Sequence, residues 1–204
     1  MKNGKSLSDI TKWMCEKFAI ETKIIPVSDH SIETRIETDK GELHLQEYWV
    51  KYRGKDTITG IEYVGSDKAR PNPEALNAIH DASLVIIAPG NPLTSIGPMI
   101  QLKGVRKELI KNKRKVVAVS PIVGDKAFSG PAGKYMEAAG LEVSAYGIAK
   151  LYADICSHIV IDTKDRMQTK KIEALGMHVH ETSIKMTNKK SEDGLASYLL
   201  NHIH

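Results

Sequence analysis

The fold is decided by residues 84–98, which read LVIIAPGNPLTSIGP. The first four residues are apolar and mostly β-branched, which is typical of a buried strand. The following residues are rich in Gly, Pro, Asn, Thr and Ser, which favour turns. A helical pattern begins near Pro98, because proline is tolerated in the first turn of a helix. The stretch therefore predicts a strand, a loop and a helix in direct succession.

A loop of this kind has two interpretations. The first N–H groups of a helix have no partner within the helix, and the helix dipole leaves partial positive charge at that end. A phosphate satisfies both, and Thr and Ser hydroxyls add further donors. Equally, turns of this composition are common in α/β proteins and only change the direction of the chain. The loop alone leaves both interpretations open.

The same alternation of strand and helix continues to the C-terminus. It predicts a mainly parallel sheet with helices on both faces, in which ligands bind at the carboxyl ends of the strands. The strands are expected at 84–87, 115–120, 141–145, 159–161 and 177–180, and the helices at 74–81, 98–112, 131–139, 148–157, 165–175 and 191–203.

The N-terminal third has a different pattern. A helix is expected over 7–18, with Trp13 and Phe18 in the core, because its apolar residues fall at helical spacing. Short apolar runs then predict a β-rich section. We expect a single domain over 1–204, with the β-rich section over 1–70 and the alternating section over 71–204. The strands of the first section are expected at 23–27, 32–36, 42–50 and 58–63.

Composition excludes several classes of protein. The 204 residues carry a net charge of +4, which suits a phosphorylated ligand, but the charges are scattered and aromatic residues make up only 5%, which disfavours nucleic acid. No apolar run approaches the length of a membrane span, and the start lacks the apolar core of a signal peptide. Two isolated cysteines without a metal-binding pattern favour a reducing compartment. We therefore expect a cytoplasmic protein that binds neither nucleic acid nor membrane.

A second loop, at 120–131, resembles the first in composition. It also follows an apolar strand, carries Gly and Ser, and ends at a proline that opens a helix. The two loops are expected at one edge of the sheet, where they form either a cradle for a diphosphate or two ordinary turns. The predicted phosphate-binding residues are Asn91, Thr94, Ser95 and Gly97 in the first loop and Ser120, Gly124, Ser129 and Gly130 in the second.

Two further features carry alternatives. Asp162 ends a predicted buried strand, where a carboxylate either holds Mg²⁺ or caps the next helix. Gln46, Tyr48 and Trp49 lie together on a predicted strand, where they either line a ligand face or serve packing.

Several motifs resemble the CofD family in register from about residue 6 to the C-terminus. The main ones are NPLTSIGP at 91–98, AVSPIVG at 118–124 and SGPA at 129–132, supported by QEYWV at 46–50, YAD at 152–154 and ID at 161–162. The resemblance implies a Rossmann-like three-layer fold and a 2-phospho-L-lactate transferase of coenzyme F-420 biosynthesis. Such an enzyme uses Mg²⁺ to move a phospholactyl group from lactyl-2-diphospho-5'-guanosine, or a phosphoenolpyruvyl analogue, to the deazaflavin precursor Fo.

The resemblance also implies where the substrates bind. The two loops would hold the guanosine diphosphate of the donor, and Gln46, Tyr48 and Trp49 are the candidates for binding the acceptor. The family's N-terminal glycine-rich segment and its acidic residues have no counterpart in this sequence, so the fold is expected to be incomplete and no catalytic residue is identified. A homodimer and a separate N-terminal partner chain are both open. The alternative function is that of a non-catalytic nucleotide-sugar-binding regulator of the related gluconeogenesis-factor type.

Overall fold

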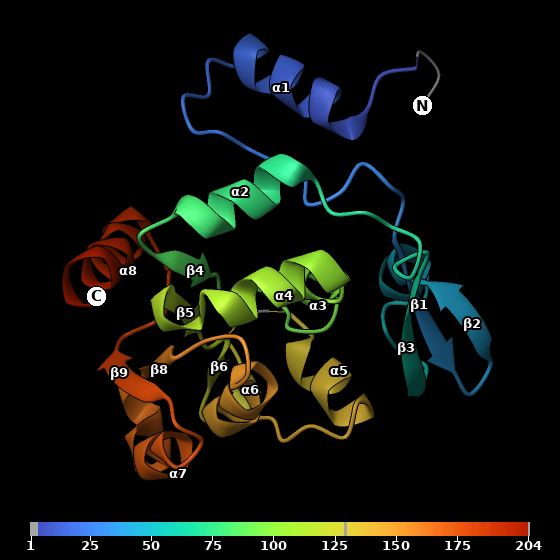
Figure 1. Cartoon of the computed structure of the whole chain (residues 1–204). Helices are drawn as coiled ribbons and strands as arrows, with labels where there is room; N and C mark the ends of the chain where they lie inside the picture. Colours follow the sequence, from blue (N-terminus) through green and yellow to red (C-terminus); the bar gives the residue numbers. More distant parts are fainter. Residues whose placement is uncertain (1–3, 129, 204) are drawn as a thin grey trace.

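The computed structural model describes residues 4–128 and 130–203 of the chain and has a mixed α/β architecture (Figure 1). Its centre is a four-stranded parallel sheet in the order β4-β5-β8-β9. Helices cover both faces of this sheet, as the alternation of apolar and turn-forming segments predicts. The four strands are β4 (Val85–Ile87), β5 (Val116–Val119), β8 (His158–Asp162) and β9 (His178–Thr182).

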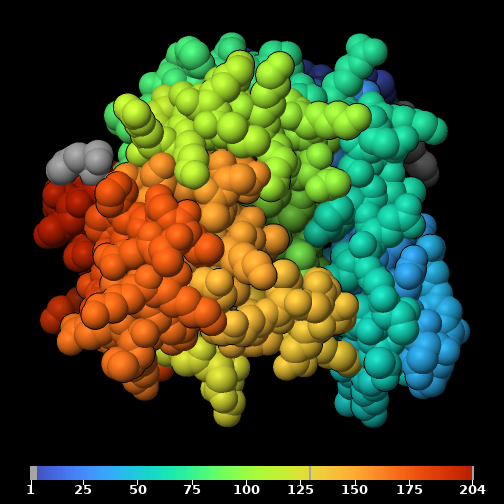
Figure 2. Space-filling model, turned by 60° about the horizontal axis from the view of Figure 1, so that its bottom comes forward, coloured from blue at the N-terminus to red at the C-terminus, as the bar shows by residue number. Residues whose placement is uncertain are grey.

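A second, antiparallel sheet comes from the N-terminal third, and a short hairpin follows β5. The antiparallel sheet has the order β2-β1-β3, which confirms that this section is β-rich. In the space-filling view it forms one side of the molecule, in teal and blue, and the C-terminal elements form the other, in orange and red (Figure 2). These strands are β1 (Glu33–Thr38), β2 (Gly41–His44), β3 (Ile58–Val64), β6 (Ile122–Val123) and β7 (Lys126–Ala127).

The helices are mostly short. The longest is α8 at the C-terminus, and α3 is a single turn. Among the described residues, no helix combines the length and the apolar character that crossing a bilayer requires. The α-helices are α1 (Leu7–Lys17), α2 (Pro73–Asp81), α3 (Gly97–Ile100), α4 (Lys103–Lys111), α5 (Ala132–Ala138), α6 (Ala145–Tyr152), α7 (Thr169–Glu173) and α8 (Lys189–His202), and η1 (Glu47–Lys51) is a π-helix while η2 (Lys113–Lys115) and η3 (Thr163–Gln168) are 3₁₀-helices.

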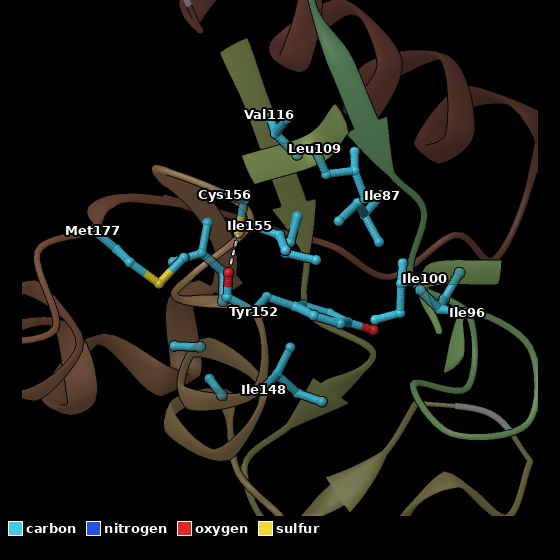
Figure 3. Packing of buried hydrophobic residues seen from close by; sticks show 14 of the residues in the cluster. Ile87, Ile96, Ile100, Leu109, Val116, Ile148, Tyr152, Ile155, Cys156 and Met177 are labelled. Atoms are coloured by element: carbon cyan, nitrogen blue, oxygen red, sulfur yellow. Dashed lines mark hydrogen bonds between the residues drawn. The ribbon is translucent and has the colours of Figure 1, made fainter. Parts of the chain in front are cut away.

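The core lies on the two faces of the parallel sheet. On one face Ala118, Ile159 and Ile161 pack against apolar residues of α4 and α6, seen at close range around Tyr152 (Figure 3). On the other face Val117 and Val160 pack against α8. Alternate residues of each strand serve opposite faces, which explains why these strands are apolar throughout rather than alternating. Each fully buried Ile or Val side chain contributes about 1.5–3 kcal/mol.

Four predicted elements differ in the structure. The segment 23–27 forms no strand, and the strand expected over 42–50 ends at His44 and continues as a helical turn into η1. The segment 141–145 forms no strand either, because Ser144 caps α6 by accepting a hydrogen bond from Gly147 N (3.0 Å). The helix expected over 165–175 is a 3₁₀-helix followed by the short α7.

The helix expected over 98–112 is broken into α3 and α4. Leu102 adopts an extended conformation (ψ 118°) between them, and its side chain is completely buried in the core. A continuous helix would point this side chain along the helix surface, so the burial of one leucine accounts for the break.

The N-terminal helix is present as α1, but the prediction that its aromatic residues belong to the core is wrong. Trp13 is 54% exposed and Phe18 is 69% exposed. Periodicity correctly identified an amphipathic helix, but it does not show what the apolar side contacts.

Three histidines meet at the amino ends of β8 and β9. His158 Nδ1 lies 3.1 Å from His180 Nε2, and the His158 ring stacks on that of His178 with a centroid distance of 5.0 Å. Burial lowers the pKa of both His158 and His180 from 6.5, and the neighbouring histidines lower each further. His158 and His180 therefore bind a proton more weakly in the folded protein than in the unfolded chain.

We expect the free energy of unfolding to decrease as the pH is lowered and His158 and His180 become protonated. Because the pKa values are lowered in the folded state, their contribution is fully present above pH 6.5 and is lost as the pH drops through the folded pKa values. Urea unfolding between about pH 7 and 5 should show this loss, and His180→Gln should reduce its slope. His44→Gln, in the other sheet, serves as the control. An equal slope for wild type and His180→Gln would contradict the account.

Candidate active site

The carboxyl ends of the four parallel strands form one edge, and a cavity of about 330 Å³ opens there. Loops from three of the strands and the first turn of α8 contribute to it. The lining residues are Pro89 after β4, Ser120, Pro121 and Phe128 after β5, Ile184 and Met186 after β9, and Glu192 in α8. The two loops that the sequence analysis expected at one edge of the sheet both reach this cavity, the first through Pro89 and the second through Ser120, Pro121 and Phe128. The predicted residues Asn91, Thr94, Ser95 and Gly97 of the first loop do not line it.

Two buried carboxylates tie these loops together. Asp162, at the end of β8, accepts a hydrogen bond from Ile184 N (3.3 Å), beyond β9. Asp165 accepts one from Gly124 N, in the β6–β7 turn, with both oxygens within 3.1 Å. The loops after β5, β8 and β9 are thereby fixed relative to one another.

The environment of Asp165 raises its pKa above the usual value. Burial raises the pKa of this carboxyl, the nearby Asp162 charge raises it further, and the hydrogen bond from Gly124 N opposes both. Gln168 Nε2 also donates to Asp165 Oδ1 (3.1 Å). A buried carboxyl with a raised pKa at the edge of a cavity is a common feature of functional sites and also of structural networks.

Asp162 acts as a helix cap. Its Oδ1 accepts from Lys164 N (3.1 Å) and its Oδ2 from Ile184 N, which confirms the capping interpretation. Both oxygens are therefore occupied by backbone donors. Among residues 4–128 and 130–203, no group of three or more His, Cys, Asp or Glu side chains is arranged to hold a metal ion. Asp162 and Asp165 both serve here as acceptors for backbone N–H groups.

Asn91 holds the first loop in shape through hydrogen bonds to backbone N–H groups of the same loop. Its Oδ1 accepts from the backbone N–H groups of Leu93 (3.0 Å) and Thr94 (3.1 Å), and its carbonyl oxygen accepts from Ser95 N (3.0 Å). The hydroxyls of Thr94 and Ser95 have no hydrogen-bond partner in the described part of the chain. The loop thus presents two free hydroxyls on a framework that its own asparagine holds.

Gly97 packs against a side chain of the antiparallel sheet. An added Cβ at this position would overlap the hydroxyl of Tyr63, which donates to Leu93 O, and would lie 3.1 Å from Pro92 O. The glycine is buried and begins α3, which is too short for a substantial dipole. Close packing on Tyr63 accounts for the glycine without a ligand.

The second loop is largely a hairpin rather than an open turn. The Ser120 hydroxyl is completely buried and bonds both to Ile122 N and to Ile122 O (3.1 Å each), so it is closed within its own turn. Gly124 adopts φ +67° in the β6–β7 turn, and its N–H is held by Asp165. Gly130 is exposed with φ +68°, and Ser129 lies outside the described residues.

The candidates for acceptor binding lie away from the cavity, around η1. Tyr48 is completely buried, and its hydroxyl donates to Gly54 O (3.1 Å) and Asp56 O (3.0 Å). Its ring meets that of Tyr135 edge-on at 6.3 Å, so packing explains this residue. Gln46 and Trp49 are exposed and remain available for a ligand.

Three cavity residues lie outside the two predicted loops: Ile184, Met186 and Glu192. Pro89, Pro121 and Phe128 lie within those loops, but only Ser120 was predicted to bind a ligand. The rule that parallel strands end at one edge applies to β9 as well as to β4 and β5. Applied to the segment after residue 182, it would have indicated Ile184 and Met186. Glu192 required knowledge of how α8 packs on the sheet.

Comparison with known proteins identifies the family. The model of the family described as 2-phospho-L-lactate transferase CofD matches residues 1–196. The chain is 40% identical over 200 residues to the 2-phospho-L-lactate transferase of Methanosarcina mazei, covering 98% of this chain and 65% of that protein. This chain belongs to the CofD family.

Other relatives agree with this assignment. The 2-phospho-L-lactate transferase of Methanocaldococcus jannaschii is 43% identical over 176 residues, which cover 84% of this chain and 56% of that one. A crystal structure of a Bacillus halodurans protein, described as a member of the UPF0052 family, shares the fold with a TM-score of 0.67 at 16% identity, covering 96% of this chain and 67% of that one. The chain matches less than two thirds of the length of these transferases, 65% of the Methanosarcina mazei protein and 56% of the Methanocaldococcus jannaschii protein.

The packing of Gly97 generates a prediction about stability. Gly97→Ala should lower the free energy of unfolding by about 1–3 kcal/mol, because the new methyl group displaces the Tyr63 hydroxyl. Adding Tyr63→Phe to Gly97→Ala should recover part of the loss, which urea unfolding of the two single variants and the double variant would measure.

Gly194→Ala is the matched control, because an added Cβ in this α8 position meets no atom within 4 Å. Unchanged stability in Gly97→Ala, together with weaker nucleotide binding, would show instead that Gly97 faces a ligand.

Proposed function

We propose that this chain forms the donor-binding part of a 2-phospho-L-lactate transferase. The proposed donor is lactyl-2-diphospho-5'-guanosine or its phosphoenolpyruvyl analogue, and the proposed acceptor is Fo. The observation that carries the proposal is the shared cavity, to which the segments after β4, β5 and β9 all contribute. Relatives named 2-phospho-L-lactate transferase, at about 40% identity, support the same chemistry.

The diphosphate would bind along the first loop. Thr94 and Ser95 offer hydroxyls that bond to no other described residue, and Asn91 holds the loop in shape. Hydrogen bonds to charged phosphate oxygens are stronger than those between neutral groups. A loop that is organised before binding spends little free energy on ordering when the donor arrives.

The guanine base would occupy the cavity. Phe128 and Met186 offer apolar surface for a planar ring, and the carboxylate of Glu192 accepts hydrogen bonds only. The edge of guanine presents N–H donors, which such a carboxylate matches and adenine would match less well. Glu192 would therefore contribute to the choice of base.

The reaction would proceed by attack of a hydroxyl oxygen of Fo on the phosphorus that carries the lactyl group. The new P–O bond joins phospholactate to Fo, the P–O bond to the guanosine phosphate breaks, and GMP leaves with the electron pair. The chain's residues contribute positioning and hydrogen bonds to the phosphate oxygens, which dominate catalysis of phosphoryl transfer. No residue of this chain is assigned as the proton acceptor.

Magnesium is a proposed cofactor, and residues 4–128 and 130–203 contain no group of three or more His, Cys, Asp or Glu side chains arranged to hold it. Mg²⁺ is commonly bound through substrate phosphates together with one or two carboxylates, and it keeps several waters. It would therefore be held chiefly by the diphosphate of the donor.

Calorimetric titration with GDP and Mg²⁺ tests the proposal. We expect saturable binding, and we expect Ser95→Ala and Thr94→Val each to weaken it about tenfold or more, because each removes a hydrogen bond to charge. Ser83→Ala is the matched control, since Ser83 is also exposed but precedes β4, at the opposite end of the strand.

Two results would contradict the proposal. An absence of GDP binding would remove the nucleotide from this chain. Equal affinity in wild type, Ser95→Ala and Thr94→Val would remove the first loop from the site.

A further inference from the structure

Helix α1 presents its apolar side chains to solvent. Leu7, Trp13, Met14 and Phe18 recur at the spacing that places side chains along one side of a helix. All four are exposed, and no residue of α1 is buried. An amphipathic helix normally turns this side to the core, so α1 has the reverse of the usual orientation.

The polar side of α1 faces the body of the protein. A hollow of about 530 Å³ lies between this side of α1, the segment 20–26 and the start of α2. Ile20 and Ile24 in that segment are also exposed. The α1 residues that line the hollow are Ser8, Asp9, Lys12, Cys15 and Glu16.

Polar contacts hold α1 in this orientation. The Ser8 N–H and hydroxyl both donate to Asp29 Oδ1 (2.7 and 2.8 Å), and Asn72 Nδ2 donates to Ser8 Oγ (3.0 Å). Ser6 caps the helix and exchanges hydrogen bonds with Asp9. The helix is thus complete and attached through its polar side, which leaves the apolar side for another partner.

A second uncovered surface is the outer edge of β4. This strand ends the sheet order, so its outer edge pairs with no strand in the described part of the chain. Ile86 stands opposite Val117 in the register, on the face that α8 covers, yet it is 41% exposed. An open edge with an exposed apolar side chain is a template for a further strand.

The relatives indicate what covers these surfaces. This chain matches 65% and 64% of the length of two Methanosarcina transferases, and 67% of the Bacillus halodurans structure that shares its fold. About a third of each relative therefore has no counterpart in these 204 residues. Removing a segment that packs on a core exposes the apolar residues that it covered, on helices and at sheet edges.

We propose that the apolar side of α1 and the outer edge of β4 are docking surfaces for a polypeptide segment equivalent to that missing third. Burial of these side chains would favour a complex, because removing apolar surface from water is favourable. The inference rests on family membership and on exposure, and it does not depend on the proposed reaction.

Coexpression tests the proposal without any nucleotide. The 204-residue chain is produced together with the tagged segment of the Methanosarcina mazei relative that lies outside the match. We expect capture of a 1:1 complex by the tag. With Trp49→Phe as background, Trp13 is the only remaining tryptophan of this chain, and its emission should shift to the blue as it becomes buried.

Phe18→Glu on α1 and Ile86→Lys on β4 should each reduce recovery of the complex about tenfold or more. Met167→Glu is the matched control, because Met167 is 92% exposed and apolar but lies on η3. Phe18 and Met167 are 69% and 92% exposed, so changing either removes no core contact of the isolated chain. Ile86 is partly buried in the sheet, so circular dichroism of the isolated Ile86→Lys variant checks that it folds.

Three results would overturn the proposal. The first is no complex with the segment. The second is equal loss in Phe18→Glu, Ile86→Lys and Met167→Glu. The third is burial of Trp13 in a homodimer that forms without the segment and that Phe18→Glu abolishes, because the occupant would then be a second copy of this chain. Nucleotide binding enters none of these readouts, so they are independent of the test with GDP.

Discussion

Two buried carboxylates hold together the edge of the sheet on which the proposed site depends. Asp162 and Asp165, at and after the end of β8, accept hydrogen bonds from the backbone N–H groups of Ile184, after β9, and Gly124, after β5. Removing one carboxylate would leave a buried or partly buried N–H without a partner, at a cost of about 1–3 kcal/mol. The spacing of the loops, and with it the shape of the cavity, follows from these bonds.

The polar groups at this edge fall into two classes, those that form hydrogen bonds within the protein and those that do not. The Ser120 hydroxyl and the Gly124 N–H form hydrogen bonds within the protein. The Thr94 and Ser95 hydroxyls form none within residues 4–128 and 130–203, and they lie on a loop that Asn91 organises. A site for an anionic donor needs both classes, because donors are effective only when they are held in position before the ligand arrives.

Much of the fold could be predicted from the sequence, because a β-branched strand followed by a Gly- and Pro-rich turn has few alternatives in an α/β protein. The parallel sheet and the meeting of the segments after β4 and β5 follow from that pattern. Where the structure departs from the predicted elements, the burial of particular side chains accounts for the difference. Leu102 breaks a predicted helix by entering the core, and Tyr48 turns a predicted strand into a helical turn.

The site was predictable in position but not in detail. Composition indicated which loops meet, whereas the partners of each hydroxyl depend on contacts between distant segments, such as Gly97 with Tyr63. The exposure of Trp13 shows most clearly where prediction from the sequence stops. The spacing of apolar residues in a helix is the same whether they pack on their own chain or on another segment.

Hydrogen–deuterium exchange with and without GDP and Mg²⁺ tests most directly whether one ligand joins these loops. The account predicts that the segments 89–96, 120–128 and 184–192 gain protection together and at the same ligand concentration. Protection of only one of the three, or protection confined to residues around η1, would contradict it.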